Sequence, residues 1–174
     1  MIPGEKINLR PVTKADLPLI NNWANDLDFN SEFNNFGLRV PDYFEKGFAE
    51  RGLLTAASGT LMVETKDGEM VGDVSYHQQQ YGPNDGSRAY NIGISLHAKY
   101  RGKGFGVEAQ KLLAAYLFAT YAIMRVEAST DVTNLLEQRA LERAGFTRDG
   151  VLRKAQWRNG DWHDLVVYSK LRGE

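Results

Sequence analysis

Residues 88–122, RAYNIGISLHAKYRGKGFGVEAQKLLAAYLFATYA, form the most informative stretch of this sequence. The pattern predicts a strand, a loop that contains three glycines, and then a long amphipathic helix. Glycine lets an anion approach the backbone closely, and the free amides and the dipole at a helix N-terminus attract negative charge. Two cations, Arg101 and Lys103, lie in the same loop. This segment therefore predicts a binding site for a pyrophosphate group.

Two common phosphate-binding motifs do not fit this loop. A P-loop needs a lysine that is followed by serine or threonine, whereas Lys103 is followed by Gly104. A dinucleotide-binding fingerprint needs the glycine spacing GxGxxG, whereas the loop has GxGxG. The pattern that does match is RxxGxG, which is formed by Arg101, Gly104 and Gly106.

The composition is typical of a soluble globular protein. Hydrophobic residues make up 43% of the chain and charged residues 25%, so we expect a single domain over residues 1–174. A net charge of −1 gives no attraction to nucleic acid or to an anionic membrane, and we expect neither as a partner. No signal peptide or membrane-spanning segment is apparent, which predicts a cytoplasmic location. The absence of cysteine excludes disulfides, thiolate metal sites and a cysteine nucleophile, and we expect no metal cofactor.

Hydrophobic periodicity and turn residues predict the remaining elements. The pairs 67–68 (Asp-Gly) and 159–160 (Asn-Gly) are strong signals for β-hairpin turns, and Gly93 within a strand suggests a bulge or a close backbone approach. Residues 28–40, rich in Asn and Phe, are predicted to form a loop. The order βααβββαβαββ predicts an α+β fold with a mixed seven-stranded sheet and helices on both faces. The expected strands are 7–12, 60–66, 69–79, 88–97, 123–130, 146–158 and 161–171, and the expected helices are 17–27, 41–52, 105–117 and 134–144.

The RxxGxG pattern between this strand and this helix resembles the acetyl-CoA loop of the Gcn5-related N-acetyltransferases (GNAT). The element order is also that of the family, over nearly the whole chain. Residues 92–109, IGISLHAKYRGKGFGVEA, resemble IGYxLxPxYxGKGxxxEA of the RimJ/RimL-like branch, and residues 134–146, NLLEQRALERAGF, resemble its NxxSxxxLxxxGF. The ending matches in its NG turn and in Asp164. The resemblance implies a GNAT fold with a mostly antiparallel sheet, and acetyl-CoA as co-substrate.

The resemblance also implies where coenzyme A binds. Two strands are expected to diverge near Gly93, and the pantetheine arm is expected to hydrogen-bond the backbone of Leu96, His97 and Ala98. Asn134 matches the family asparagine whose side chain binds that arm, and an asparagine offers both a donor and an acceptor to an amide-rich ligand. The pyrophosphate is expected on the backbone amides of Arg101, Gly102, Lys103, Gly104, Phe105 and Gly106.

The general acid and base cannot be transferred from the family, because this sequence departs from its patterns. Many members have a tyrosine acid where this chain has Leu141. RimL-like enzymes have a serine and a glutamate at the positions of Glu137 and Gln156, and related proteins often have a glutamate at that of Asn91. We expect Glu137 to be a solvated helical residue.

The remaining catalytic candidates are His77, Tyr90 and Asn91. Histidine titrates near neutral pH, which suits a base, but a lone histidine on a strand is more often a packing or surface residue. Tyr90 can orient a water or donate to sulfur, although an aromatic residue on a strand is usually part of the core. Asn91 can position an amine but cannot carry the proton, so deprotonation through water stays open. The candidates for acceptor binding are Asp73, Gln156 and Trp157, with residues 28–40 as an acceptor lid.

We predict an acetyl-CoA-dependent N-acetyltransferase that transfers the acetyl group directly to a primary amine in a ternary complex. The acceptor is a small molecule or a protein N-terminus, and the missing serine and glutamate favour the small molecule. The alternative is a CoA-binding sensor or scaffold without catalysis, because the usual acid and base are absent. We expect a monomer or a homodimer.

Overall fold

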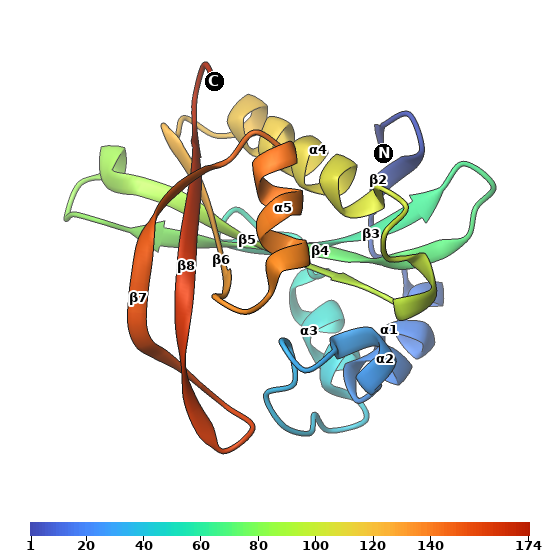
Figure 1. Ribbon diagram of the computed structural model, residues 1–174. Coiled ribbons are helices and arrows are strands. Elements are labelled where there is room, and N and C mark those ends of the chain that lie inside the picture. Colours follow the sequence, from blue (N-terminus) through green and yellow to red (C-terminus); the bar gives the residue numbers. More distant parts are fainter.

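The computed structural model describes residues 1–174, which form one eight-stranded sheet in the order β1-β2-β3-β4-β5-β6-β8-β7 (Figure 1). The strands are β1 (Ile2–Pro3), β2 (Ile7–Pro11), β3 (Ser58–Thr65), β4 (Met70–Gln80), β5 (Arg88–Leu96), β6 (Arg125–Asp131), β7 (Thr147–Arg158) and β8 (Asp161–Leu171). The α-helices are α1 (Leu17–Ala24), α2 (Leu27–Asn30), α3 (Tyr43–Arg51), α4 (Phe105–Thr120) and α5 (Leu135–Arg143). Short 3₁₀ turns are η1 (Lys14–Asp16), η2 (Asp85–Ser87) and η3 (Ala98–Tyr100).

All neighbouring strands are antiparallel except β5 and β6, which are parallel and joined by the α4 crossover. Helices α4 and α5 cover one face of the sheet, and α1, α2 and α3 lie on the other (Figure 1). The predicted α+β class with helices on both faces is therefore confirmed. The strand number is eight rather than seven, because residues 2–3 add a two-residue strand that pairs with β2.

The local predictions differ from the structure mainly at ends of elements. The predicted helix 17–27 stops at Ala24, and α2 takes up the first residues of the predicted loop 28–40. Both hairpin turns are confirmed: Gly68 has φ +85°, and Asn159 and Gly160 have φ +53° and +83°. Such left-handed angles suit Gly and Asn, which explains why these pairs are reliable turn signals.

Each face of the sheet has its own hydrophobic core. The larger core, of 22 buried residues, lies under α4 and α5 and includes Leu113, Leu117 and Leu141. The smaller core of six lies under α1 and α2, where Trp23 stacks on Phe29 at 4.5 Å between ring centroids. The two cores fix the helices on opposite faces and leave the end of β5 between them.

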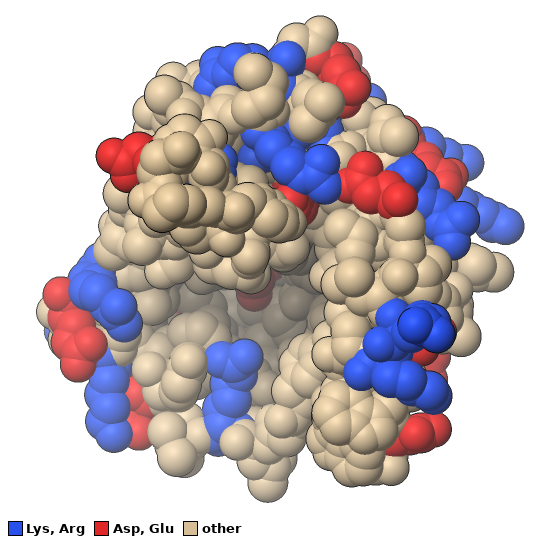
Figure 2. All heavy atoms as spheres, turned by 90° about the vertical axis from the view of Figure 1, so that its left-hand side faces the viewer, with Lys and Arg blue, Asp and Glu red and all other residues tan.

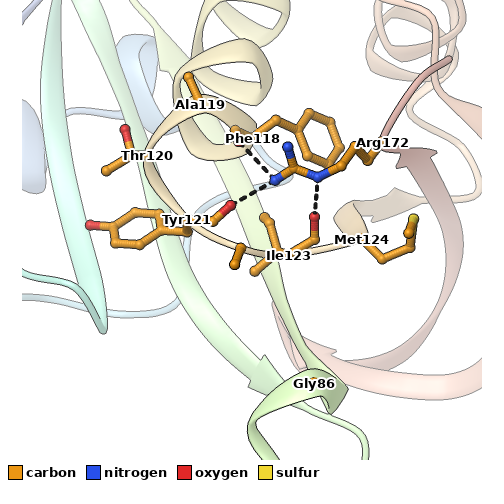
Figure 3. A pocket seen from close by; sticks show the side chains of 9 residues that line it. Gly86, Phe118, Ala119, Thr120, Tyr121, Ile123, Met124 and Arg172 are labelled. Atoms are coloured by element: carbon orange, nitrogen blue, oxygen red, sulfur yellow. Dashed lines mark hydrogen bonds between the residues drawn. The ribbon is translucent and has the colours of Figure 1, made fainter.

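The C-terminal end of α4 is capped by a distant residue. Arg172 donates from Nε to the Ile123 carbonyl at 2.8 Å, and from Nη2 to the Phe118 and Tyr121 carbonyls at 2.7 Å each (Figure 3). A cation at this end also complements the helix dipole. The pocket around Arg172, of about 500 Å³, lies at the C-terminal end of α4. The loop of residues 101–106, called the glycine loop below, lies at the other end of this helix. None of the helices combines the length and the apolar composition that crossing a bilayer requires.

Candidate active site

The glycine loop ends in a row of backbone amides that have no acceptor within the chain. Gly102 and Gly104 have φ of +76° and +86°, the left-handed region in which glycine is favoured. The amides of residues 102–107 make no hydrogen bond in the protein, and the first helical bond runs from the Glu108 amide to the Gly104 carbonyl at 3.2 Å. This row opens α4, a 16-residue helix, so the dipole adds to its attraction for an anion. The loop therefore has the predicted form of a phosphate site.

A cation that the sequence analysis missed lies over this loop. The Glu108 carboxylate accepts from the amides of Glu5 and Lys6, and this fastens the N-terminal segment to the first turn of α4. Lys6 Nζ consequently lies 3.5 Å from the Lys103 carbonyl, and 3.3 Å from the place of a Cβ on Gly104. No local signal could have revealed this, because Lys6 and the loop are nearly a hundred residues apart.

Of the two cations that the sequence places in this loop, Arg101 is held by backbone carbonyls and is not free to reach a phosphate. Its guanidinium donates from Nε to the Leu96 carbonyl and from Nη2 to the Asp28 and Phe29 carbonyls, at 2.8 Å each. Its own amide donates to the Ala98 carbonyl at 3.2 Å. Arg101 therefore joins the glycine loop to α2, and Lys6 and Lys103 remain as the cations of the loop.

The pairing of β5 with β6 ends at Ile92 and Ala128, although β5 continues to Leu96 and β6 to Asp131. The predicted divergence near Gly93 is thus confirmed. A bulge is not: β4 and β5 pair without a register shift, and the close neighbour of Gly93 is the Ser75 hydroxyl. The two strands leave a gap at the glycine-loop end of the sheet.

Ladder geometry shows which backbone groups face this gap. The His97 amide donates to the Val71 carbonyl at 3.1 Å, so the odd-numbered residues of β5 bond to β4. The amides of Ile94 and Leu96 therefore point toward β6, beyond the last pair. The Val132 amide donates to the Asp164 carbonyl of β8, so the even-numbered residues of β6 bond to β8. The backbone groups of the odd-numbered Ser129 therefore face β5. The gap is lined by amides and carbonyls that an extended, amide-containing chain can bond.

The predicted contacts at the end of β5 are only partly free. The His97 amide is bonded to β4, and the Leu96 carbonyl accepts from Arg101, so neither is free for a ligand. The Leu96 amide remains available, and Ala98 is exposed. Asn134 caps α5: its Oδ1 accepts from the Glu137 amide at 3.3 Å and its Nδ2 donates to Thr130 Oγ1 at 2.9 Å. Asn134 thus lies beside the gap with one donor hydrogen left.

Four predicted polar residues gather on the sheet face opposite α4. Asp73 pairs with Met62 of the smaller core, so Asp73 and His77, in alternation on β4, face the α1–α3 side. Asn91 of β5 pairs with His77 and shares its face. Gln156 reaches this side from β7, where its Oε1 accepts from Arg158. Figure 2 shows a hollow with mostly uncharged walls on the side of the molecule that carries β7.

Burial raises the pKa of Asp73 to about 7, and the Arg39 guanidinium opposes that rise. Such a carboxyl is suited to exchange a proton at neutral pH. His77 is exposed on the same strand.

Tyr90 lies on the other face, in the larger core. It is only 2% exposed, its hydroxyl donates to the Ala56 carbonyl at 2.6 Å, and its ring packs against Tyr76 and Tyr121. Desolvation raises its pKa further above the ordinary value. This surrounding favours a packing role for Tyr90, and it leaves Tyr90 without a contact to the polar face that carries Asn91.

Glu137 is not the solvated helical residue that the sequence suggested. It is half-buried on α5, and burial raises the pKa of its carboxyl to about 7, with the nearby Gln110 amide acting in the opposite direction. Gln110 of α4 is 1% exposed, and neither polar atom of its side chain has a hydrogen-bond partner. Unpaired buried polar groups are rare, and here they accompany a carboxyl that can donate a proton near pH 7.

A buried cation ties the β7–β8 hairpin to the predicted acceptor lid. Arg158, 3% exposed, donates from Nη2 to Asp131 Oδ2 at 2.5 Å and from Nη1 to the Phe33 carbonyl at 3.3 Å. His163 Nδ1 lies 2.9 Å from the same Asp131 oxygen. Trp157 is 56% exposed and packs edge-on against Trp162, at 5.4 Å, so it forms a cross-strand pair.

The sequence also matches a known family model, the acetyltransferase (GNAT) domain, over residues 6–147. The chain belongs to the GNAT acetyltransferase family. The probable N-acetyltransferase YjcK of Bacillus subtilis is 29% identical and the alignment covers 98% of this chain and 97% of that protein. The predicted family and enzyme class, an N-acetyltransferase, are therefore confirmed.

Solved structures share this GNAT fold. Spermidine N-acetyltransferase from Vibrio cholerae, in complex with CoA and spermine, gives a TM-score of 0.80 at 20% identity, with 97% of each chain covered. Ribosomal-protein-S5-alanine acetyltransferase from Vibrio fischeri gives 0.79 at 21% identity, with 99% and 96% covered. The acceptors in these two names are chemically unlike, so the neighbours support the fold and leave the acceptor to the site itself.

Proposed function

We propose that this GNAT enzyme uses acetyl-CoA and transfers the acetyl group directly to a small primary amine within a ternary complex. One observation carries the proposal: the row of free amides at residues 102–107 adjoins the gap between β5 and β6. A phosphate site next to a slot of backbone donors and acceptors matches a ligand that has a pyrophosphate at one end and an amide-rich arm at the other.

The coenzyme would be held mainly by the backbone. The amides of residues 102–107 would bind the pyrophosphate, and Lys6 and Lys103 would add charge. The amides of Ile94 and Leu96 and the carbonyl of Ser129 would bind the pantetheine arm. The solved relative from Vibrio cholerae is named as a complex with CoA, which supports this use of the fold.

The acceptor would approach from the opposite face, which carries Asp73, His77 and Asn91. In the reaction the amine nitrogen forms a bond to the acetyl carbon, the carbon–sulfur bond breaks, and the sulfur keeps its electron pair. Asp73 would take the proton from the amine, directly or through a water that Asn91 and His77 position. Ser75, between Asp73 and His77 on β4, pairs with Gly93, so both side chains flank the start of the gap. The Ile94 amide would stabilise the negative charge on the acetyl oxygen.

Glu137 would supply a proton to the departing thiolate from the α5 side. A carboxyl with a pKa of about 7 is partly protonated at neutral pH, and a free thiol titrates near 8.5, so the transfer needs only modest help. We expect Glu137→Gln to lower kcat about tenfold and to remove a fall in kcat above pH 7. Unchanged kcat and an unchanged pH profile would remove Glu137 from the reaction.

The proposal is tested by incubating the protein with acetyl-CoA and primary amines and measuring free thiol together with product mass. We expect thiol release that depends on the amine, with an acetylated product in equal amount. Thiol release without an acetylated amine would indicate hydrolysis. CoA binding without amine-dependent release at any pH from 6 to 9 would contradict transfer and favour a sensor or scaffold.

A further inference from the structure

A second pocket, of about 260 Å³, opens between α3 and the β3–β4 hairpin. It lies on the acceptor face, the face of the sheet that carries Asp73, His77 and Asn91. Its walls are mostly polar. They carry one guanidinium, one imidazole and several hydroxyl groups, and no acidic residue lines them. The polar residues are Arg51, Thr55, Ser58, Thr60, Ser75 and His77.

The polar groups of this pocket are available to a ligand. The Thr55 hydroxyl donates to the Ser58 carbonyl at 2.9 Å, whereas the hydroxyls of Ser58, Thr60 and Ser75 form no hydrogen bond within the chain. Arg51 forms no ion pair, although other exposed cations do, such as Lys46 with Asp42 at 3.1 Å. An unpaired guanidinium among free hydroxyls favours an anion with several oxygen acceptors.

The pocket continues the face on which the reaction was placed. Side chains at alternate positions of β4 share a face, so Asp73, Ser75 and His77 form one row. At about 3.3 Å per residue, Ser75 lies roughly 7 Å and His77 roughly 13 Å from Asp73 along the strand. Ser75 is also the residue packed against Gly93, where β5 leaves β6. An acceptor with its amine at Asp73 would therefore extend along β4 into the pocket.

We propose that this pocket binds the far end of the acceptor, and that the acceptor is a primary amine carrying a carboxylate or phosphate group roughly 7 to 13 Å from its nitrogen. Arg51 is then the specificity-determining residue. A polyamine fits poorly, because its second cation would lie beside Arg51 without a counter-charge. This inference rests on the proposed function, since it takes Asp73 as the place of the amine.

The test compares three acceptors of equal chain length: 6-aminohexanoate, 6-aminohexanol and 1,6-diaminohexane. We expect kcat/KM to be about tenfold higher for the carboxylate than for the alcohol, and lowest for the diamine, because a charge-assisted hydrogen bond contributes about that factor. Arg51→Gln should lower the ratio of kcat/KM for the carboxylate to kcat/KM for the alcohol from about ten to about one. Lys46→Gln, on the same helix, should change neither and serves as the matched control.

Equal rates for the three acceptors, a preference for the diamine, or an unchanged ratio in Arg51→Gln would overturn the inference while leaving acetyl transfer intact. If none of the amines is acetylated, the proposed function fails, and the pocket is then tested by binding alone. Hexanoate should bind the wild type measurably more tightly than hexylamine does, and Arg51→Gln should abolish the difference. Equal binding of the two probes would overturn the inference in that case as well.

Discussion

The two sides of the sheet around β5 offer different kinds of group to a ligand. On the α4 side most of the groups without partners are backbone amides, at residues 102–107 and at Ile94 and Leu96, and the buried Gln110 side chain is the exception. On the α1–α3 side they are side chains: Asp73 and His77 of β4, and Arg51 of α3. Backbone geometry binds any ligand with the same phosphates and amides, whereas side chains can differ from one relative to the next. We therefore expect the backbone groups to bind the same donor substrate in different relatives, and the side chains to set the acceptor.

The largest expected effect is on the backbone side. Gly104→Val should weaken CoA binding about 1,000-fold, because φ +86° is unfavourable for a β-branched residue and the side chain would stand among the amides. Isothermal titration with CoA measures this. Gly68→Val is the matched control, since Gly68 has φ +85° in a remote hairpin turn. If a folded Gly104→Val variant binds CoA as the wild type does, the phosphate site is elsewhere.

The next effect is on the side-chain side. Asp73→Asn should lower kcat/KM for the amine about 100-fold and leave CoA affinity unchanged, because it removes only the base. In the wild type kcat/KM should rise as the pH approaches 7 from below, because the Asp73 carboxyl loses its proton, and the variant should lack this ascending limb of the profile. Asp42→Asn, at an exposed carboxyl, should retain the wild-type pH profile.

The same substitution has a stability consequence with a defined sign. The pKa of Asp73 is higher in the folded protein than in the unfolded chain, so folding disfavours the charged carboxylate. The free energy of unfolding of the wild type should therefore fall as the pH rises from about 4 to 7, and Asp73→Asn should lessen that fall. A steeper fall in the variant, measured by urea unfolding, would contradict the burial of this carboxyl.

A smaller effect on activity is expected where the β7–β8 hairpin meets the loop after α2. Arg158→Gln removes one partner of a buried ion pair with Asp131 and should destabilise the protein by about 3 kcal/mol. It should also raise KM for the acceptor about tenfold, because the contact with the Phe33 carbonyl is lost, while CoA affinity stays within twofold. Arg153→Gln, exposed on the same strand, should have neither effect. An equal loss of CoA affinity would show that the two sides are not independent.

The smallest expected effect belongs to the cation above the glycine loop. Lys6→Gln should weaken CoA binding about threefold and reduce the salt dependence of binding, because an exposed charge near phosphate contributes little and is screened by ions. CoA titrations at two salt concentrations measure both quantities. A change in KM for the acceptor, with CoA binding unchanged, would contradict the assignment of Lys6 to the CoA site.

Part of this site was predictable because it depends on local sequence. The glycines at 102 and 104, the following amphipathic helix and the two hairpin turns each require particular residues at adjacent positions, whatever the rest of the chain does. The divergence near Gly93 followed from the resemblance to the family. The sequence could not show that Arg101 is bonded to α2 or that Glu137 is half-buried, because both depend on what packs against them.

Most of the order of strands and helices, and the form of the glycine loop, could be read from the amino-acid sequence, because hydrophobic period, turn residues and glycine conformations act over a few neighbouring positions. The family followed from motifs that the chain shares with its relatives. The packing of distant segments was needed to establish which side chains share a face and which carboxyls are buried. Asp73, Glu137 and Arg51 acquire their environments from segments far away in the chain, and desolvation and unpaired charge arise only when those segments meet.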